Sequence, residues 1–369
     1  KSIIKITTFA LGVLLMTTSC DKIADFGNTN TNPAATNTPN TAALLTNVLS
    51  GIGGYSYQNI PSLYCQYFSE TQYPEASQYS LQMVSPQGNY SGSLYDLVNI
   101  IKTNTDDATK LSASLNGANE NQIAIARILK SYMFWVMTDR SGDLPYKTAL
   151  TGNPAVSFER QKSIYEGMIT ELTEAVDQFV DGAAIKGDIV YNGDIAKWKK
   201  LANSMRMLMA LRLSKRYPGA SEYAATQFKA ALTHSAGHIS DNADNFALYY
   251  PGGNFRNPYY GMYDGRKDYG ESATMTSMLA VLNNDARVSV FGADVSGNAS
   301  SLGVPYGRNR TWINNWCSVN PAYAYVFDPD YRTQTSPLFI VKASTVLLAR
   351  AEAADRGWTT ETANTETLY

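Results

Sequence analysis

The segment that decides the fold is residues 194–216, DIAKWKKLANSMRMLMALRLSKR. Its large apolar side chains recur at intervals of three and four residues, and they are Trp198, Leu201, Met205, Leu208 and Met209. This interval places them on one face of an α-helix, which makes a turn about every 3.6 residues. Pro218 and Gly219 predict that the helix ends near Tyr217. The segment is therefore predicted to be a long helix that packs against others.

The same periodicity recurs along most of the chain. It predicts further helices over residues 121–139, 163–180 and 338–355. Less regular spacing predicts helices over residues 41–51, 93–115, 221–236 and 273–283. Helices that follow one another in pairs are typical of tetratricopeptide-like arrays, in which each helix packs on its neighbour. The sequence therefore predicts an all-α scaffold of tetratricopeptide-like helix pairs.

Residues 240–335 differ from the predicted scaffold, because they have no sustained period and are rich in Asn, Gly, Asp and aromatic residues. Examples are YYPGGNFRNPYYGMYDGRKDYG at 249–270 and GVPYGRNRTWINNW at 303–316. A long irregular segment in a compact protein is usually either functional or disordered, and the many rings argue against disorder. We expect long, ordered, aromatic-rich loops on the helical scaffold.

Residues 1–19 have the features of a secretory signal peptide, with Lys1 and Lys5 before a short apolar stretch. That stretch is too short for a membrane-spanning helix, which needs about 20 residues. Ser19-Cys20 is similar to a lipobox, in which the cysteine becomes the lipidated N-terminus, although Thr17 stands where an aliphatic residue is usual. We predict a lipid anchor at Cys20 and a tether over residues 20–40; an ordinary signal peptide is the alternative.

The composition excludes some classes of protein. The net charge is −2 and Lys and Arg form no run, so the basic surface that nucleic-acid binding needs is missing. Cys65 and Cys317 are the only cysteines after Cys20, too few for a disulfide-held domain. They are predicted to be thiols, with a single bridge between them as the alternative.

No cofactor or metal site is predicted. His234 and His238 have a spacing that can bind zinc on a helix, but Ser235 stands where a zinc protease has its catalytic Glu, and Gly237 indicates a helix end. Four aspartates could supply the oxygen ligands that calcium needs, but they lack the spacing of a known calcium loop. They are Asp241, Asp244, Asp328 and Asp330.

Four segments, in this order, resemble the SusD/RagB family of Bacteroidetes outer-membrane nutrient-binding lipoproteins, and in particular its SusD-like branch. They are NTNTNPAATNTP at 28–39, WVMTDRSGDLPYKTA at 135–149, WKKLANSMR at 198–206 and AEAADRGW at 351–358. In the second, Gly142 and Pro145 are expected to end a helix. Family members continue with further helices after the last segment, so the helical domain, here residues 41–369, is expected to be incomplete at its C-terminus.

The resemblance implies a function without catalysis. Such a protein sits on the outer membrane, held by its lipid and facing the cell exterior. It binds an oligosaccharide or a peptide and delivers it to a SusC-like TonB-dependent barrel. On the helix that contains the third segment, we expect Arg206 and Arg212 to pair with carboxylates such as Glu352 or to cap backbone carbonyls between packed helices. Binding of an anionic ligand by these arginines is the alternative. An exported glycan hydrolase with two catalytic carboxylates and a helical-repeat adaptor for other proteins are the alternatives.

Aromatic residues in the irregular segments are the candidate ligand contacts. The apolar faces of sugar rings stack on flat aromatic surfaces, and polar side chains at the edge meet their hydroxyl groups. Two groups fit this chemistry, and they are Tyr73 with Tyr79, and Arg310, Trp312, Asn315 and Trp316. A third group is Tyr259, Tyr260 and Tyr263. Any one of these rings is more often a packing residue than a ligand contact.

Overall fold

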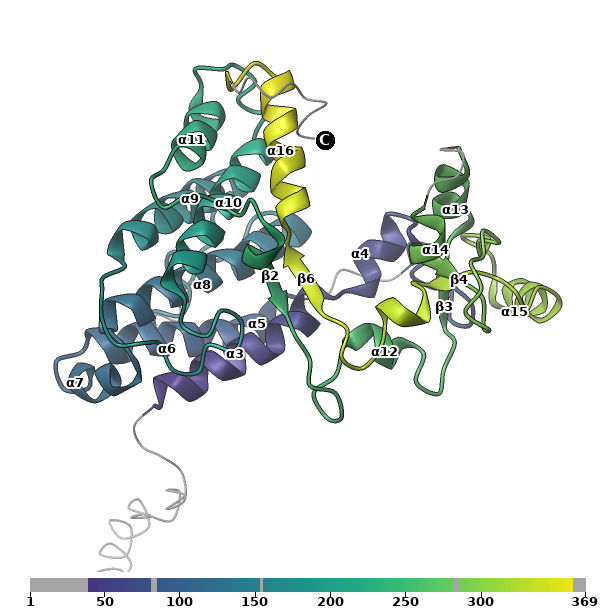
Figure 1. Cartoon of the computed structure of the whole chain (residues 1–369), viewed down its shortest axis with the longest axis horizontal. Helices are drawn as coiled ribbons and strands as arrows, with labels where there is room; N and C mark the ends of the chain where they lie inside the picture. The colour runs from purple at the N-terminus through teal and green to yellow at the C-terminus, as the bar shows by residue number, and fades with distance from the viewer. Residues whose placement is uncertain (1–38, 81–84, 153–154, 282–285, 361–369) are drawn as a thin grey trace, which may run out of the picture. The chain divides into compact units, whose positions relative to one another are not determined.

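The computed structural model describes residues 39–80, 85–152, 155–281 and 286–360 (Figure 1). From Asn40 onward these residues belong to one compact unit. The predicted signal peptide, Cys20 and nearly all of the predicted tether lie outside the described residues, as do residues 361–369.

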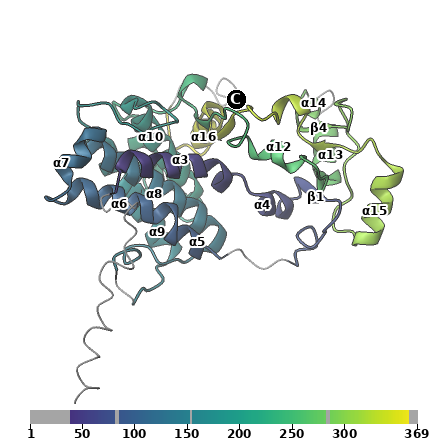
Figure 2. The ribbon, with the colours of Figure 1, turned by 90° about the horizontal axis from the view of Figure 1, so that it is seen from below.

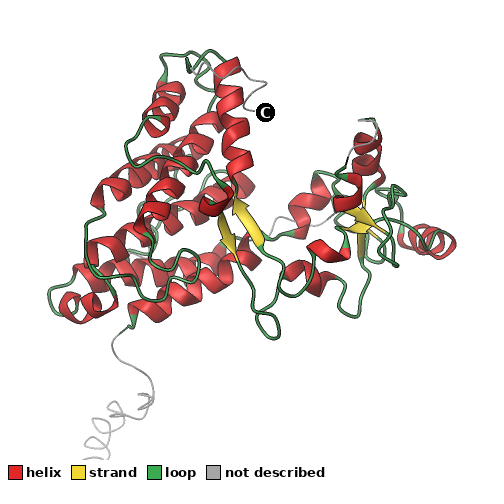
Figure 3. Ribbon diagram, in the orientation of Figure 1, coloured by secondary structure: helices red, strands yellow, loops and turns green. Residues whose placement is uncertain are grey.

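Helices form most of the scaffold, as predicted, and the strands are few and short (Figure 3). The longer helices are α3 (Thr41–Ser56), α6 (Ser93–Thr105), α8 (Asn119–Ser141), α9 (Gln161–Gln178), α10 (Ile195–Arg212), α11 (Tyr223–Leu232), α15 (Arg310–Val319) and α16 (Ala343–Asp355). The shorter ones are α4 (Asn59–Tyr64), α5 (Gln87–Ser91), α7 (Lys110–Ala113), α12 (Pro258–Met262), α13 (Ala273–Ala280) and α14 (Val288–Phe291). Short 3₁₀ turns are η2 (Ser114–Asn116), η3 (Asn242–Asp244) and η4 (Pro329–Tyr331).

Consecutive long helices pack on one another, which confirms the predicted helix-pair scaffold. Helix α8 packs against α6 and α9, and α10 packs against α9 and α11. Trp198 of α10 is fully buried, and its indole Nε1 donates a hydrogen bond to Asp188 Oδ2 at 2.8 Å. The same carboxylate accepts the backbone N–H groups of Val190, Tyr191 and Gly193. Asp188 therefore fixes both the core tryptophan and the turn that precedes its helix.

The predicted end of the helix in the second family-like segment is confirmed. Gly142 has φ 73°, a left-handed conformation that favours glycine. Its N–H donates to the Thr138 carbonyl at 2.8 Å, and the Thr138 hydroxyl donates to its carbonyl at 2.7 Å. The chain therefore leaves α8 at Gly142, before Pro145.

Two helix predictions need correction. Residues 338–341 were predicted to start a helix but form strand β6 (Leu338–Val341), which pairs antiparallel with β2 (Phe246–Leu248). Its sequence, Leu-Phe-Ile-Val, is a short apolar run that periodicity cannot assign to helix or strand. The helix predicted over 93–115 is broken at Asp106, which is extended and accepts the Ala108 N–H on its side chain at 2.9 Å.

Arg212 pairs with a carboxylate, as expected, although the partner is Asp139, whereas Arg206 bonds to an amide. Arg206 Nε donates to Gln227 Oε1 at 3.0 Å. Arg212 Nε lies 3.4 Å from Asp139 Oδ2. Glu352 instead pairs with Arg356 on its own helix, at 2.6 Å. Arg356 is four residues from Glu352, so the two side chains meet within one helical turn and Glu352 does not pair with an arginine of α10.

The described residues of the irregular segment contain short helices and strands within its loops. Strand β3 (Tyr269–Glu271) pairs antiparallel with β1 (Phe68–Glu70), and β4 (Gly292–Ala293) pairs with β5 (Tyr325–Val326). Figure 2 shows β1, α13 and α15 gathered in the same part of the compact unit. The β1–β3 pair therefore brings an early loop, residues 71–80, to the late aromatic segment.

Candidate ligand-binding surface

The loop after β1 is closed by hydrogen bonds at its base. A side-chain oxygen of Glu70, Oε2, accepts the Ser77 N–H at 2.9 Å, and the Ser77 hydroxyl accepts the Glu70 N–H at 3.0 Å. The Thr71 N–H donates to the Asp268 carbonyl at 2.8 Å, next to β3. These bonds hold residues 71–76 as a compact protrusion beside the β1–β3 pair.

A second segment, residues 305–309, runs along this loop. Ser69 Oγ donates to the Pro305 carbonyl at 3.2 Å, and Gln78 Nε2 donates to the Arg308 carbonyl at 3.1 Å, across 230 positions of sequence. The Tyr306 hydroxyl donates to the Leu63 carbonyl at 2.6 Å. The two groups of residues predicted from the sequence are therefore brought together by tertiary contacts.

Tyr73 is the clearest contact between the two predicted groups. The Cζ atom of Arg310 lies 4.6 Å from the centre of its ring, and that of Arg266 lies 5.3 Å away. Asp268 holds the Arg266 guanidinium at 2.6 Å. Tyr73 is still 44% exposed. Cation–π contact therefore fixes the orientation of a ring that remains open to a ligand.

Tyr79 lies at the other end of the loop, in a left-handed conformation with φ 56°. Its ring is 53% exposed and contacts Tyr64 and Tyr306, with ring centres 5.2 and 5.9 Å apart. Its hydroxyl donates to the Tyr64 carbonyl at 3.2 Å and accepts from Gln66 Nε2 at 3.1 Å. Burial raises the pKa of Tyr306 above its ordinary value, which leaves it a neutral phenol.

Helix α15 carries the remaining predicted residues. Asn309 caps the helix by accepting the Trp312 N–H at 2.9 Å. Trp312 is 40% exposed and has the Arg308 Cζ atom 4.8 Å from its ring centre. Asn315 is also exposed, whereas Trp316 is half-buried, with its ring centre 6.4 Å from that of Tyr323. Trp312 and Asn315 are thus open to a ligand, and Trp316 mainly supports the helix.

We use the name aromatic surface for Tyr73, Tyr79, Arg308, Arg310 and Trp312. Arg308 of this surface and its neighbours Arg266 and Tyr306 are not among the ligand-binding residues that the sequence predicts. The cationic residues of the segment GRNR, at 307–310, were a usable signal, because arginine commonly covers aromatic rings.

In the third tyrosine group, Tyr259 and Tyr263 are packing residues. Tyr263 stacks on Tyr325 with ring centres 4.9 Å apart, and its hydroxyl donates to the Tyr269 carbonyl at 3.0 Å. Tyr259 has edge contacts with Tyr57 and Phe327, at 4.6 and 4.7 Å between centres. These two rings therefore stabilise the fold through contacts with other aromatic side chains.

Three of the four aspartates that could supply calcium ligands have structural roles. Asp241 and Asp328 cap the 3₁₀ turns η3 and η4, and Asp244 pairs with Lys200 at 2.8 Å. His234 Nδ1 accepts the Ala236 N–H at 3.1 Å. Within the described ranges, no three His, Cys, Asp or Glu side chains are grouped as metal ligands would be. Cys65 and Cys317 are free thiols.

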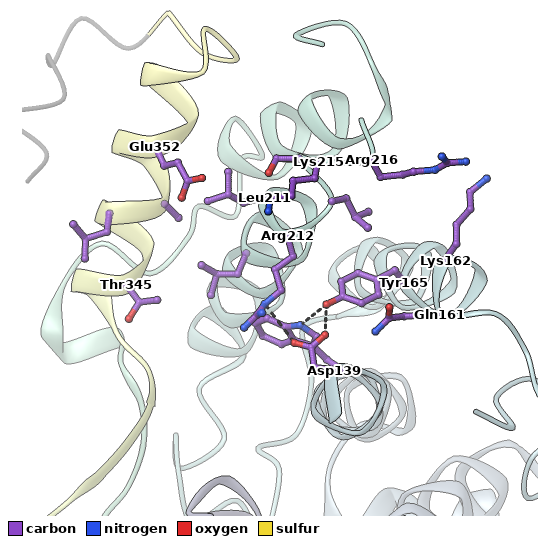
Figure 4. Close-up of a pocket in the computed structure, with 16 residues that line it drawn as sticks. Asp139, Gln161, Lys162, Tyr165, Leu211, Arg212, Lys215, Arg216, Thr345 and Glu352 are labelled. Carbon is purple, nitrogen blue, oxygen red and sulfur yellow. Dashed lines mark hydrogen bonds and ion pairs between the residues drawn. The ribbon is translucent and has the colours of Figure 1, made fainter. Parts of the chain in front are cut away.

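A pocket of about 810 Å³ lies in the helical scaffold, between α10 and α16 (Figure 4). The Tyr165 hydroxyl donates to Asp139, the Trp135 indole donates to that hydroxyl at 3.2 Å, and Arg212 pairs with the same carboxylate. These polar groups satisfy one another across three helices. They explain the packing of α8, α9 and α10 and present no exposed ring to a ligand.

Comparison with known proteins agrees with this architecture. A family model described as SusD-like_2, starch-binding associating with outer membrane, matches residues 32–369. No curated protein matches the chain. Over the part of the chain that the structure describes, no helix is long and apolar enough to cross a membrane.

Several solved structures are similar. A chitin-binding protein is 28% identical, with a TM-score of 0.70, and the match covers 88% of this chain and 72% of that one. A SusD homologue from Bacteroides fragilis is 22% identical, with a TM-score of 0.71 over 90% and 71% of the two chains. A chitin-binding SusD homologue from Flavobacterium johnsoniae is 20% identical, with a TM-score of 0.69 over 89% and 68%. The family match over nearly the whole length, together with this shared fold, establishes that the chain belongs to the SusD-like family of outer-membrane-associated proteins.

Proposed function

We propose that this protein is a lipid-anchored, non-catalytic glycan receptor at the exterior of the outer membrane. In this proposal, it captures an oligosaccharide on the aromatic surface and delivers it to a TonB-dependent barrel. The observation that carries the proposal is the pairing of Tyr73 with Arg310 and of Trp312 with Arg308. Both rings remain substantially exposed. They belong to segments that are far apart in the sequence and that the fold brings together.

The chemistry of the aromatic surface suits a sugar chain. Each exposed ring offers a flat face for the C–H side of a pyranose, and the neighbouring guanidinium groups donate hydrogen bonds to hydroxyl or acetamido oxygens. The hydrogen bonds at the base of loop 71–80 fix the Tyr73 segment before a ligand arrives, so little ordering entropy is lost on binding. The chitin-binding relatives favour β-linked N-acetylglucosamine oligomers as the first ligands to test.

A binding measurement on single variants tests the ligand site. Isothermal titration with chitohexaose and maltohexaose is expected to show binding of at least one of them to the wild type. Tyr73→Ala and Trp312→Ala should each weaken it by about fivefold or more, because truncating a central aromatic contact commonly costs more than about 1 kcal/mol. Tyr249→Ala is the matched control, since Tyr249 is exposed but lies outside the aromatic surface. Equal affinity in all four proteins would contradict the proposal.

The same experiment separates binding from hydrolysis and from peptide capture. Mass spectra of the glycan after long incubation should show an unchanged chain length. Shortened products, lost on substitution of one carboxylate, would favour a hydrolase. Titration with a peptide digest under the same conditions tests peptide binding. If the protein binds peptides but no glycan, and Trp312→Ala abolishes that binding, then the ligand is a peptide and not an oligosaccharide.

The anchor and the transporter need experiments on cells. Mass spectrometry of the mature protein should find a lipidated N-terminal cysteine, and Cys20→Ser should release the protein from membranes. Affinity purification from detergent-solubilised outer membrane should recover a TonB-dependent barrel. If the purified protein carries no barrel under conditions that retain other membrane complexes, the proposed delivery step is contradicted. Glycan binding is tested separately, by titration.

A further inference from the structure

A second concave site lies in the loop-rich part, apart from the five residues of the aromatic surface. It is a pocket of about 500 Å³ between β1, α13 and α14. Its walls are mainly apolar and include Phe68, Met275, Met278, Leu279, Phe291 and Phe327. Small-molecule sites commonly have about this size, with apolar walls and a few polar groups that fix the ligand.

Glu271 is the unusual residue of this pocket. Of the described residues that line it, Glu271 alone carries a carboxylate. Glu271 is only 3% exposed, and its Oε1 atom has no hydrogen-bond partner. Buried polar atoms nearly always have a partner, so an unpaired carboxylate oxygen at a pocket wall calls for an explanation. The nearby Glu70 shows the usual arrangement, since its carboxylate accepts the Ser77 N–H.

The backbone around Glu271 holds the carboxyl group in place. Its N–H donates to the Ala324 carbonyl and its carbonyl accepts the Val304 N–H, both at 2.8 Å. The other carboxylate oxygen lies against Gly292, where an added Cβ would be 2.4 Å from it. The backbone of Glu271 is therefore held by two chain segments, and its carboxyl lies between a third segment, at Gly292, and the wall of the pocket.

We propose that this pocket binds a small amphipathic amine, with its ammonium group on Glu271 and its apolar body among the methionine and phenylalanine side chains. An ammonium supplies both the missing donor and the missing positive charge, whereas an alcohol supplies only the donor. Methionine sulfur and aromatic faces suit an apolar ligand body and the carbon atoms next to a cation. An anionic ligand is disfavoured by the buried carboxylate, although the exposed Arg287 also lines the pocket.

The ionisation of Glu271 is consistent with this geometry. Burial raises the pKa of its carboxyl to about 7 from an ordinary value of 4.5. Near neutral pH the group therefore exists in both forms, and a bound ammonium would favour the carboxylate. This feature is independent of glycan binding, because Glu271 is not part of the aromatic surface.

Three probes with one aromatic body test the charge requirement. Titration of the full chain at pH 8 with 2-phenylethylamine, 2-phenylethanol and 3-phenylpropanoate, followed by NMR of labelled methionine methyl groups, gives affinity and location together. The amine is expected to bind and to shift the Met275 and Met278 signals. The alcohol should bind at least tenfold more weakly, and the acid should not bind. Equal affinity for the amine and the alcohol would overturn the proposal.

Two variants test the pocket itself. Glu271→Gln keeps the shape and removes the charge, so amine affinity should fall at least tenfold, while Glu120→Gln, the same change at an exposed position, should leave it unaltered. Met278→Arg adds a cation at a residue that is 60% exposed, where the fold tolerates it, and should also weaken amine binding. Wild-type affinity in either pocket variant would refute the assignment, whatever the outcome of the glycan titrations.

Discussion

The raised pKa of Glu271 predicts a specific dependence of stability on pH. In the unfolded chain the carboxyl ionises near 4.5, but in the folded protein it holds its proton until about pH 7. Between these values the folded state binds more protons than the unfolded state, so the free energy of unfolding falls as the pH rises. The contribution is fully present below about pH 4.5 and fully lost above about pH 7. Glu271 therefore destabilises the fold at alkaline pH.

The magnitude follows from the same two values. A difference between about 7 and 4.5 corresponds to about 3 kcal/mol, since one pKa unit is worth about 1.4 kcal/mol. Glu271→Gln cannot ionise, so it removes this loss. Relative to wild type, the variant should gain about 3 kcal/mol between pH 4.5 and pH 8. Any constant offset from the amide itself cancels in that comparison.

Urea unfolding followed by tryptophan fluorescence, at intervals of pH between 4.5 and 8, measures the difference directly. Besides Glu271, the described residues that line the pocket are two tyrosines, one arginine and side chains without a charge, and phenols and guanidinium groups in general ionise well above pH 8. The changing difference between variant and wild type therefore reports Glu271. Glu120→Gln, at an exposed position, should show a nearly constant difference from wild type. A difference for Glu271→Gln that stays constant with pH would refute the reasoning.

Four further substitutions test the scaffold and the aromatic surface. Asp188→Ala leaves the Trp198 indole and three backbone N–H groups without their acceptor, so urea unfolding should show a loss of at least about 3 kcal/mol. Gly187→Ala should destabilise far more than Gly142→Ala in thermal melts: both glycines have positive φ, but only at Gly187 would the new Cβ lie 2.2 Å from a backbone oxygen. Arg310→Lys keeps the charge but loses the planar contact with the ring below it, so glycan titration should show several-fold weaker binding; unchanged affinity would show that charge alone matters.

The parts of the fold that the sequence predicted are those encoded in local spacing. The period that places Trp198 and Leu201 on one face is a property of neighbouring residues, and it predicted the helix α10 itself. It did not predict that residues 201–207 are all buried, because this depends on the helices that surround α10. The strand at Leu338 was missed because its partner, β2, is about 90 positions earlier in the chain, and a four-residue apolar run carries no period of its own.

The candidate site was predictable in its residue types but not in its geometry. Exposed rings among Gly and Asn residues indicated the two groups, yet the contact of Tyr73 with Arg310 depends on the β1–β3 pair and on tertiary hydrogen bonds. Trp312 and Trp316 looked equivalent in the sequence, because only the packing of α15 decides which one faces outward. Glu271 was not singled out, since nothing in the sequence around it indicates a buried carboxyl.

The hydrogen bonds between Glu70 and Ser77 have a practical consequence for protein engineering. They close the loop at its base, so the exposed positions between them are not needed to hold the loop on the strand pair. Residues 72–76, apart from the buried Pro74 and Ala76, can therefore be randomised in a display library while the helical frame stays intact. If the aromatic surface binds glycans as we propose, selection on such a library would direct it to other polysaccharides by changing one short stretch of chain.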